Sequence, residues 1–395
     1  MTVVEYTVTG KFFCVLPFNH FATSVDGTTR LCCKIPSETT TGSLKKNSIK
    51  EIWQNEKMQS VRKQMQTGER VEECQVCYYE DSIGLISKRQ NENEHYKKIV
   101  CNGRAMQPTY LDLRLGNLCN LKCRMCNSTF SSQHVKEQNE LAKLHPNLIQ
   151  PYTEDNTAWY EDENFWSEIY ALAPTLDQII FAGGEPTLHP GVFTLLEKCV
   201  KIGRAKHIRV RLTTNMTNVP QRLIDIIDEF KEFKFECSID GIGKVFEYIR
   251  HPADWNTVKQ NVESITHTKA NIAITSVIQV YNIHNIESIW RWVDTFEGRI
   301  TFYPTLLYQP TYYQPGLIQE PYKQLILNGL RQYAKESTDE RCKNRIQSII
   351  NHVSIEPKTC KKDIVELRKF TKLLDDYRKE DIRTIIPAWD SWVYN

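Results

Sequence analysis

The stretch YLDLRLGNLCNLKCRMCNS, residues 110–128, joins a short β-rich run to three closely spaced cysteines. Cys119, Cys123 and Cys126 follow the predicted strand directly, in a loop with no fourth cysteine nearby. A structural zinc site normally closes its tetrahedron with four Cys or His ligands, whereas a cubane iron–sulfur cluster held by three thiolates leaves one iron open. An open iron is a place for chemistry, so the spacing predicts a reactive cluster in this loop.

The same strand begins a region that alternates β-rich runs with amphipathic helical segments, from residue 110 to about residue 304. Such alternation predicts an α/β fold, in which a parallel sheet carries helices on its outer face. Periodicity alone leaves an open doubly wound sheet and a barrel as alternatives, and both place ligands at the carboxyl ends of the strands. The six expected strands are YLDLRL, QIIFA, HIRVRL, FKFECSI, NIAITSVIQV and RITFYP.

The C-x3-C-x2-C spacing, followed by FAGGEPTLHP after the next strand, resembles the radical S-adenosylmethionine (radical SAM) superfamily. The resemblance covers residues 110–304 and implies a partial (β/α)6 TIM-type barrel with a [4Fe–4S] cluster on Cys119, Cys123 and Cys126. In that family S-adenosylmethionine chelates the open iron, and one electron from the cluster cleaves it to a 5′-deoxyadenosyl radical that abstracts hydrogen from substrate. The alternative for the three cysteines is a zinc or structural cluster site completed by a distant ligand.

The resemblance also implies residues that hold S-adenosylmethionine at the carboxyl ends of the strands. By this resemblance the GGEP motif binds the methionyl ammonium of S-adenosylmethionine. The TTN and SIDG motifs lie near its ribose and its carboxylate. Tight turns and strand-ending turns are the structural alternatives for all three motifs. The predicted cofactor residues are Gly183, Gly184, Glu185, Pro186, Thr214, Asn215, Ser238 and Asp240, with Val277, Gln279 and Asn282 expected near the adenine.

A second group of cysteines lies near the N-terminus, in the pattern KFFCVLPF…DGTTRLCC…EECQVC. It resembles half of a SPASM or twitch auxiliary-cluster domain, although such domains usually follow the barrel and here the pattern precedes it. The resemblance implies an auxiliary [4Fe–4S] cluster that carries an electron or supports the structure, and a four-thiolate zinc site is the alternative. The expected ligands are Cys14, Cys32, Cys74 and Cys77, with Cys33 as an alternative ligand.

Changes in residue pattern divide the 395 residues into three expected regions. Residues 1–100 form a cysteine-rich auxiliary-cluster domain, with one helix over residues 49–67 and a polar connector over residues 88–98. Residues 101–310 form the partial barrel. Residues 311–395 show apolar positions three and four apart and are expected to form a helical extension.

Composition narrows the functional classes. Lys and Arg number 50 against 48 Asp and Glu, and a formal net charge of +2 argues against a nucleic-acid partner. The sequence shows no secretory signal and no apolar run near the ~20 residues that span a bilayer, which predicts a cytoplasmic protein without a membrane partner. Thirteen cysteines in a reducing compartment favour metal ligation over disulfides.

These observations favour an enzyme over two other classes, a two-cluster electron carrier and a zinc-bearing interaction module. The expected reaction is oxidation or rearrangement of a small metabolite, so the enzyme is an oxidoreductase or a mutase. Modification of a peptide or protein is the alternative reaction. It ranks second because cysteines occupy the N-terminal region, where a domain that binds a leader peptide would be expected. An electron donor such as flavodoxin or ferredoxin is expected as a partner. The substrate itself is not legible in the sequence.

Overall fold

The computed structural model describes residues 3–7, 11–36, 38–96, 98–102, 107–153, 158–355 and 360–392. The chain divides into two compact units that interleave in sequence. Unit 1 contains the chain up to Cys119, Thr153–Thr213 and Pro220–Lys234. Unit 2 contains Asn120–Tyr152, Thr214–Val219 and the chain from Phe235 onward.

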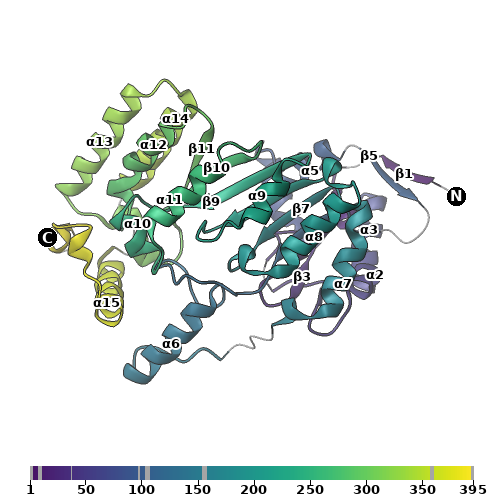
Figure 1. Ribbon diagram of the computed structural model, residues 1–395, viewed down its shortest axis with the longest axis horizontal. Coiled ribbons are helices and arrows are strands. Elements are labelled where there is room, and N and C mark those ends of the chain that lie inside the picture. The colour runs from purple at the N-terminus through teal and green to yellow at the C-terminus, as the bar shows by residue number, and fades with distance from the viewer. Residues whose placement is uncertain are drawn as a thin grey trace. The chain divides into compact units, whose positions relative to one another are not determined.

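Unit 1 carries most of a mixed sheet (Figure 1). Its neighbouring strands follow the order β8-β7-β6-β2-β3-β4, and β2, β6, β7 and β8 pair in parallel while β2-β3 and β3-β4 are antiparallel. The small N-terminal domain therefore continues the same sheet through the β2-β6 pair. The strands are β2 (His20–Thr23), β3 (Thr28–Arg30), β4 (Gly42–Ser43), β6 (Tyr110–Arg114), β7 (Gln178–Ala182) and β8 (Arg209–Thr214).

The two faces of this sheet differ in chemistry. Side chains alternate between faces along a strand, and parallel register places Asp112 beside Ile180 and Ile180 beside Arg211 on one face. The other face is apolar and buried, with Leu111, Ile179 and Val210 in register. A separate antiparallel pair joins β1 (Val3–Thr7) to β5 (Lys98–Asn102).

Unit 1 also contains the helices of the N-terminal domain and three helices of the sheet region. Helices α7 and α8 contact each other, and the buried stripe of α8 includes Leu195, Leu196 and Cys199 as expected. The helices are α1 (Leu16–Asn19), α2 (Ile49–Gln54), α3 (Glu56–Thr67), α4 (Gln75–Ser82), α5 (Lys88–His95), α7 (Glu163–Leu172), α8 (Pro190–Lys201) and α9 (Gln221–Ile227).

One expectation for the N-terminal domain is wrong, and another lacked a helix that the structure shows. The single helix expected over residues 49–67 is two helices, because Asn55 has an extended backbone that ends α2. The Asn55 side chain then caps α3 by accepting a hydrogen bond from the Met58 N–H at 3.0 Å. The polar connector expected over residues 88–98 contains helix α5, whose first turn is capped by the Ser87 side chain.

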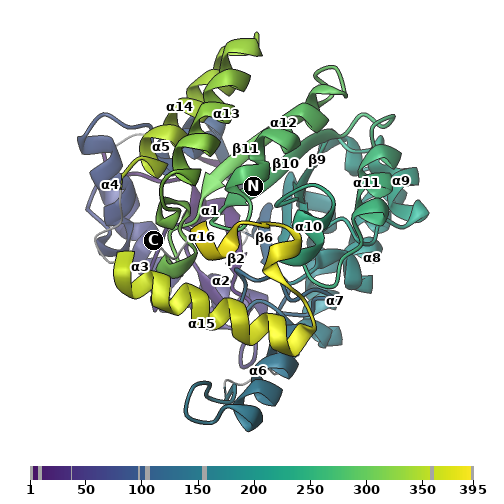
Figure 2. The same cartoon turned by 90° about the vertical axis from the view of Figure 1, so that its left-hand side faces the viewer.

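Unit 2 contains the last strands and the C-terminal helices. Strand β9 (Glu232–Ser238) begins in unit 1 and ends in unit 2, where β10 (Asn271–Ile278) pairs in parallel with β11 (Ile300–Leu306). Figure 2 shows α13 beside α14, in agreement with their direct contact. The helices are α6 (Ser132–Leu144), α10 (Lys244–Ile249), α11 (Trp255–Ser264), α12 (Ile286–Asp294), α13 (Tyr322–Glu336), α14 (Glu340–Val353), α15 (Cys360–Arg378) and α16 (Trp389–Trp392).

The predicted fold class is confirmed. The six strands from β6 to β11 match the six expected from sequence, the sheet is mainly parallel, and the C-terminal part is helical. Among the described helices, none is both long and apolar enough to cross a membrane. The carboxyl ends of β6, β7 and β8 are therefore where the candidate residues of unit 1 should be sought.

Candidate functional site

The loop that carries Cys119 is held by the GGEP turn within unit 1. Gly184 N–H donates to Gly116 O at 3.0 Å, and Glu185 N–H donates to Leu118 O at 2.7 Å. The approach is so close that a Cβ on Gly184 would lie 2.2 Å from Leu118 O. The glycines were expected to admit a ligand, and the structure shows that they admit the backbone of the cysteine loop.

Glu185 is almost fully buried and already serves a local role. Its carboxylate accepts hydrogen bonds from Thr187 N–H at 3.0 Å and from the Thr187 hydroxyl at 2.7 Å. These bonds cap the short turn Pro186–Leu188 and fix the orientation of the carboxylate. The predicted contact with a methionyl ammonium would have to be made by a carboxylate held in this way.

The other two cysteines of the loop, Cys123 and Cys126, lie in unit 2, and their backbone is bonded to the segment after α10. Lys122 N–H donates to His251 O and Arg124 N–H donates to Ile249 O, both at 2.8 Å. From the opposite side, His134 Nε2 lies 2.8 Å from Cys123 O. The loop is therefore fixed by main-chain bonds on one side and by a helix side chain on the other.

A buried ion pair lies against Cys123. Arg250 Nη2 is 2.7 Å from Asp240 Oδ2, and Arg250 Nη1 is 3.8 Å from Cys123 Sγ. Burial raises the pKa of the Cys123 thiol, and the charge of Arg250 offsets part of that rise. Asp240 also accepts a hydrogen bond from Val277 N–H at 2.6 Å, so this predicted cofactor residue connects Arg250 to the end of β10.

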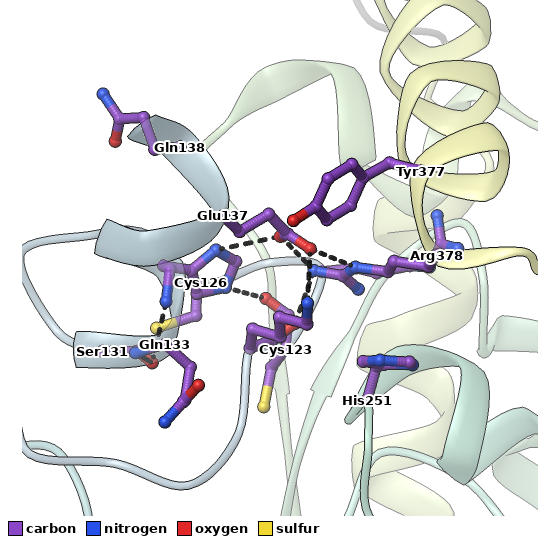
Figure 3. Close-up of polar contacts among 12 residues, drawn as sticks. Cys123, Cys126, Ser131, Gln133, Glu137, Gln138, His251, Tyr377 and Arg378 are labelled. Atoms are coloured by element: carbon purple, nitrogen blue, oxygen red, sulfur yellow. Dashed lines mark hydrogen bonds and ion pairs between the residues drawn. The ribbon is translucent and has the colours of Figure 1, made fainter. Parts of the chain in front are cut away.

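The C-terminal helix α15 reaches the cysteine loop through a buried cation. Figure 3 shows Glu137 of α6 facing Arg378 of α15, with Cys123 beside them. Arg378 Nη2 is 2.6 Å from Glu137 Oε2 and donates to Lys122 O at 2.8 Å. Burial alone would raise the pKa of Glu137, but Arg378 and then Lys122 outweigh it and hold that pKa below its usual value.

A second buried network involves Arg124, which lies between the two cysteines. Its Nη2 contacts Asp375 Oδ1 and Glu380 Oε2 at 2.5 and 2.6 Å, and its side chain has no exposed surface. Tyr248 OH donates to the same oxygen of Asp375 at 2.8 Å. Helix α15 and the residues after it thus hold the loop at two points, Lys122 and Arg124.

The remaining predicted cofactor residues of unit 2 differ in whether their side chains already make hydrogen bonds within the protein. Asn215 accepts a hydrogen bond from Thr217 N–H at 2.9 Å and donates to Asn120 Oδ1 at 2.9 Å. Thr214 Oγ1 accepts from Met216 N–H at 3.1 Å, and Ser238 is the last residue of β9. The two bonds within residues 214–217 form a turn at the end of β8, and the cofactor roles of Thr214, Asn215 and Ser238 stay predictions.

Gln279 is the exception among these residues. It follows β10 directly, is fully buried, and neither its amide oxygen nor its amide nitrogen has a hydrogen-bond partner among the described residues. Asn282, the next polar residue, is satisfied, because its side chain accepts from Gln279 N–H and donates to Asp240 O. A buried amide without partners fits a position that a bound cofactor or water completes.

The N-terminal cysteines come together around one small pocket of unit 1. Cys14, Cys32, Cys74 and Cys77 line it, whereas Cys33 is exposed and is not among its lining residues. Among the described residues, no three His, Cys, Asp or Glu side chains converge tightly enough to hold a single metal ion.

The pocket is electrostatically unfavourable for thiolates unless a cation is present. Burial raises the pKa of Cys32 to about 11 and that of Cys74 to about 12. A bound cationic cluster would reverse this effect, because metal coordination deprotonates a thiol. Cys14, Cys32 and Cys77 are buried and Cys74 is half-buried, and all four are free thiols, which fits the predicted auxiliary cluster.

Sequence analysis missed the helix that shapes this pocket. Arg89 and Asn93 of α5 both donate to Phe13 O at 2.8 Å, next to Cys14, and Val15 N–H donates back to Asn93 at 2.9 Å. The spacing of Arg89 and Asn93 on one helix face was a signal, but polar residues four apart are not distinctive. The role of α15 was missed for a related reason, since its partners lie far away in sequence.

Comparisons with known proteins agree with this geometry. The model of the radical SAM superfamily matches residues 113–296, and the model of SPASM, an iron–sulfur cluster-binding domain, matches residues 14–78. The second match precedes the first, which confirms the unusual domain order predicted from the cysteine pattern. No curated protein matches the chain.

Several solved structures share parts of the fold. The structure titled "Native anSMEcpe with bound AdoMet" is 20% identical, with 56% of this chain and 59% of that chain covered and a TM-score of 0.38. SuiB from Streptococcus suis is 17% identical, with coverages of 72% and 58% and a TM-score of 0.36. A SuiB complex with precursor peptide SuiA is 15% identical, with coverages of 75% and 62% and a TM-score of 0.35.

This chain spans about three fifths of the length of the solved structures it matches first. Likenesses at these TM-scores carry no argument about activity or substrate. The family identification rests on the two family models and on the cysteine patterns that they cover. Residues 113–296 are therefore a radical SAM domain and residues 14–78 a SPASM domain that precedes it, with [4Fe–4S] clusters and S-adenosylmethionine as cofactors.

Proposed function

We propose that this protein is an enzyme that reductively cleaves S-adenosylmethionine and abstracts hydrogen from a small metabolite, with oxidation or rearrangement as the net result. The observation that carries the proposal is the C-x3-C-x2-C loop after β6 within the radical SAM match. Modification of a peptide or protein is the alternative function. Flavodoxin or ferredoxin is the proposed electron donor.

In this proposal Cys119, Cys123 and Cys126 are the ligands of the catalytic cluster. When bound, the cluster and S-adenosylmethionine supply a 5′-deoxyadenosyl radical, which takes a hydrogen atom from the substrate. The chain supplies placement. The GGEP turn supports the backbone before Cys119, and Arg250 and Arg378 hold the loop around Cys123. Gln279 offers an unsatisfied amide for the cofactor, as the adenine assignment predicts.

Incubation with reductant and S-adenosylmethionine tests the proposal. We expect the anaerobically reconstituted, dithionite-reduced protein to release 5′-deoxyadenosine, detected by liquid chromatography and mass spectrometry. Deuterated metabolites and deuterated peptides are then compared, since the true substrate class transfers deuterium into 5′-deoxyadenosine. Unreduced protein is the control. Full cluster occupancy without any 5′-deoxyadenosine would contradict the proposed reaction.

We further propose that Cys14, Cys32, Cys74 and Cys77 ligate the auxiliary cluster, and that Cys33 does not. Their convergence on one pocket supports this ligand set. The cluster then either accepts an electron from a substrate radical, which suits a net oxidation, or supports the fold.

A pair of adjacent substitutions separates the two candidate ligands. We expect Cys32→Ala to lower iron from about eight to about four atoms per chain, because a four-thiolate cubane loses one of its ligands. Cys33→Ala should retain all the iron, and it is the matched control because it removes the neighbouring thiol. Iron analysis and electron paramagnetic resonance of both variants check this. Loss of iron in Cys33→Ala alone would reverse the assignment.

A further inference from the structure

A polar cavity of about 300 Å³ lies at the amino-terminal ends of the strands of unit 1. Strands β7, β8 and the start of β9 form one wall, and helix α5 forms another. The cavity is not part of the predicted cofactor site, which lies at the carboxyl ends of these strands. Its lining residues are Asn91, Glu92, His95, Gln178, Arg209, Val210, Arg211, Glu232 and Lys234.

The charged residues of the cavity come from the polar face of the sheet. Gln178 and Arg209 are register partners, and Arg211 is two residues further along β8, so all three side chains lie on the face that carries Asp112. The opposite face supplies the apolar core. The charged side chains on this face give the cavity its polar lining.

Arg209 is the most informative residue of the cavity. Its Nη2 contacts Tyr96 OH at 3.5 Å and Gln178 Oε1 at 3.4 Å, both long contacts with neutral groups. Within the described part of the chain, no carboxylate lies within ion-pair distance of this half-buried guanidinium. A guanidinium is suited to bind a carboxylate through two parallel hydrogen bonds.

The charges around the cavity are nearly balanced, so the preference for an anion comes from Arg209 itself. Arg209, Arg211 and Lys234 line the cavity together with the carboxylates of Glu92 and Glu232. Asp177 adds a third carboxylate nearby, because it accepts a hydrogen bond from Tyr96 OH at 3.1 Å. Burial raises the pKa of Asp177, and the charge of Arg209 offsets part of that rise.

Two elements that line the cavity also lead to predicted cofactor residues of unit 1. Gln178 begins β7 and Ala182 ends it, so about 13 Å of strand separates the cavity from Gly183. Helix α5 connects the cavity to the auxiliary pocket, because its first residues, Lys88 and Arg89, line that pocket. A substrate anchored here would extend from the cavity toward the carboxyl ends of the strands.

We propose that this cavity binds a carboxylate group of the substrate, with Arg209 as the principal donor. The inference rests on the proposed function, and it adds that the substrate is an elongated molecule with a carboxylate remote from the carbon that loses hydrogen. The remote carboxylate serves as an anchor, and its binding energy orients the reacting end.

Calorimetric titration with succinate as the probe tests the carboxylate site. The reconstituted protein is titrated without reductant, at constant ionic strength set with sodium chloride. We expect saturable binding that Arg209→Met weakens about tenfold or more, because a hydrogen-bonded charge partner is lost. Lys201→Met is the matched control, since it removes an exposed positive charge on α8, outside the cavity.

Two further variants keep the test decisive if Arg209→Met fails to fold. Arg209→Lys retains the positive charge but loses the two parallel N–H donors of the guanidinium. Lys234→Met removes a second cation that lines the cavity. Both should bind succinate more weakly than the wild type. Binding that is absent in the wild type, equally weakened in Lys201→Met, or tighter for inorganic phosphate than for succinate would overturn the proposal. Because the titration needs no turnover, its failure is distinguishable from a failure to form 5′-deoxyadenosine.

Discussion

Replacement of Cys119, Cys123 and Cys126 by Ala together is expected to abolish 5′-deoxyadenosine formation and to remove about half of the iron. The wild-type protein should hold about eight iron atoms per chain after reconstitution, four in each cubane. The variant loses every protein ligand of the catalytic cluster, while the thiols around the auxiliary pocket remain in place. Iron analysis and a 5′-deoxyadenosine assay on the same sample measure both effects.

Cys199→Ala is the matched control for the triple variant. Cys199 is also a buried cysteine, but it lies on the apolar stripe of α8 and was expected to act as a small hydrophobe. Iron content and cleavage should both be retained in this control. Loss of iron with cleavage intact in the triple variant would refute the cluster assignment, and zinc in place of iron in the wild type would refute the mechanism.

The features that could be predicted from the sequence each depend on residues that are neighbours in the chain. The strand before Cys119, the GGEP turn after β7 and the apolar stripe of α8 each occupy one short window, in which strand or helix periodicity is visible. The order of the two domains was also legible, because the spacing of cysteines survives as a local pattern.

The missed features depend on pairs of residues far apart in the chain. Arg124 meets Asp375 across 251 positions, and Glu137 meets Arg378 across 241. Charged residues on a helix are ordinarily solvated, so nothing in the sequence distinguishes Arg378 from an exposed arginine. The close approach of Gly184 to Leu118 O was missed too, because only the folded backbone brings them together. The roles of the cofactor residues stay predictions.

Arg378→Met is expected to lower the free energy of unfolding of unit 2 by about 3 kcal/mol, because the buried carboxylate of Glu137 loses its main partner and keeps only Lys122, whose Nζ is 3.0 Å from it. The Arg378 side chain has no exposed surface and that of Glu137 has 2%, so solvent cannot replace the lost charge. The variant also loses the hydrogen bond to Lys122 O, next to Cys123. Urea unfolding, followed together with hydrogen exchange of the α6 amides, measures the effect.

The adjacent Lys372–Asp376 pair supplies the matched control on the same helix. Both of its side chains are largely exposed, at 78% and 66%, so Lys372→Met should change the free energy of unfolding by less than about 1 kcal/mol. The double variant Glu137→Leu/Arg378→Met should recover most of the loss, since no unpaired charge remains buried. Equal effects of Arg378→Met and Lys372→Met would contradict the proposal that Arg378 stabilises the cysteine loop. A recovered fold with a changed electron paramagnetic resonance signal from the catalytic cluster would show that Arg378 positions the ligand loop as well as stabilising it.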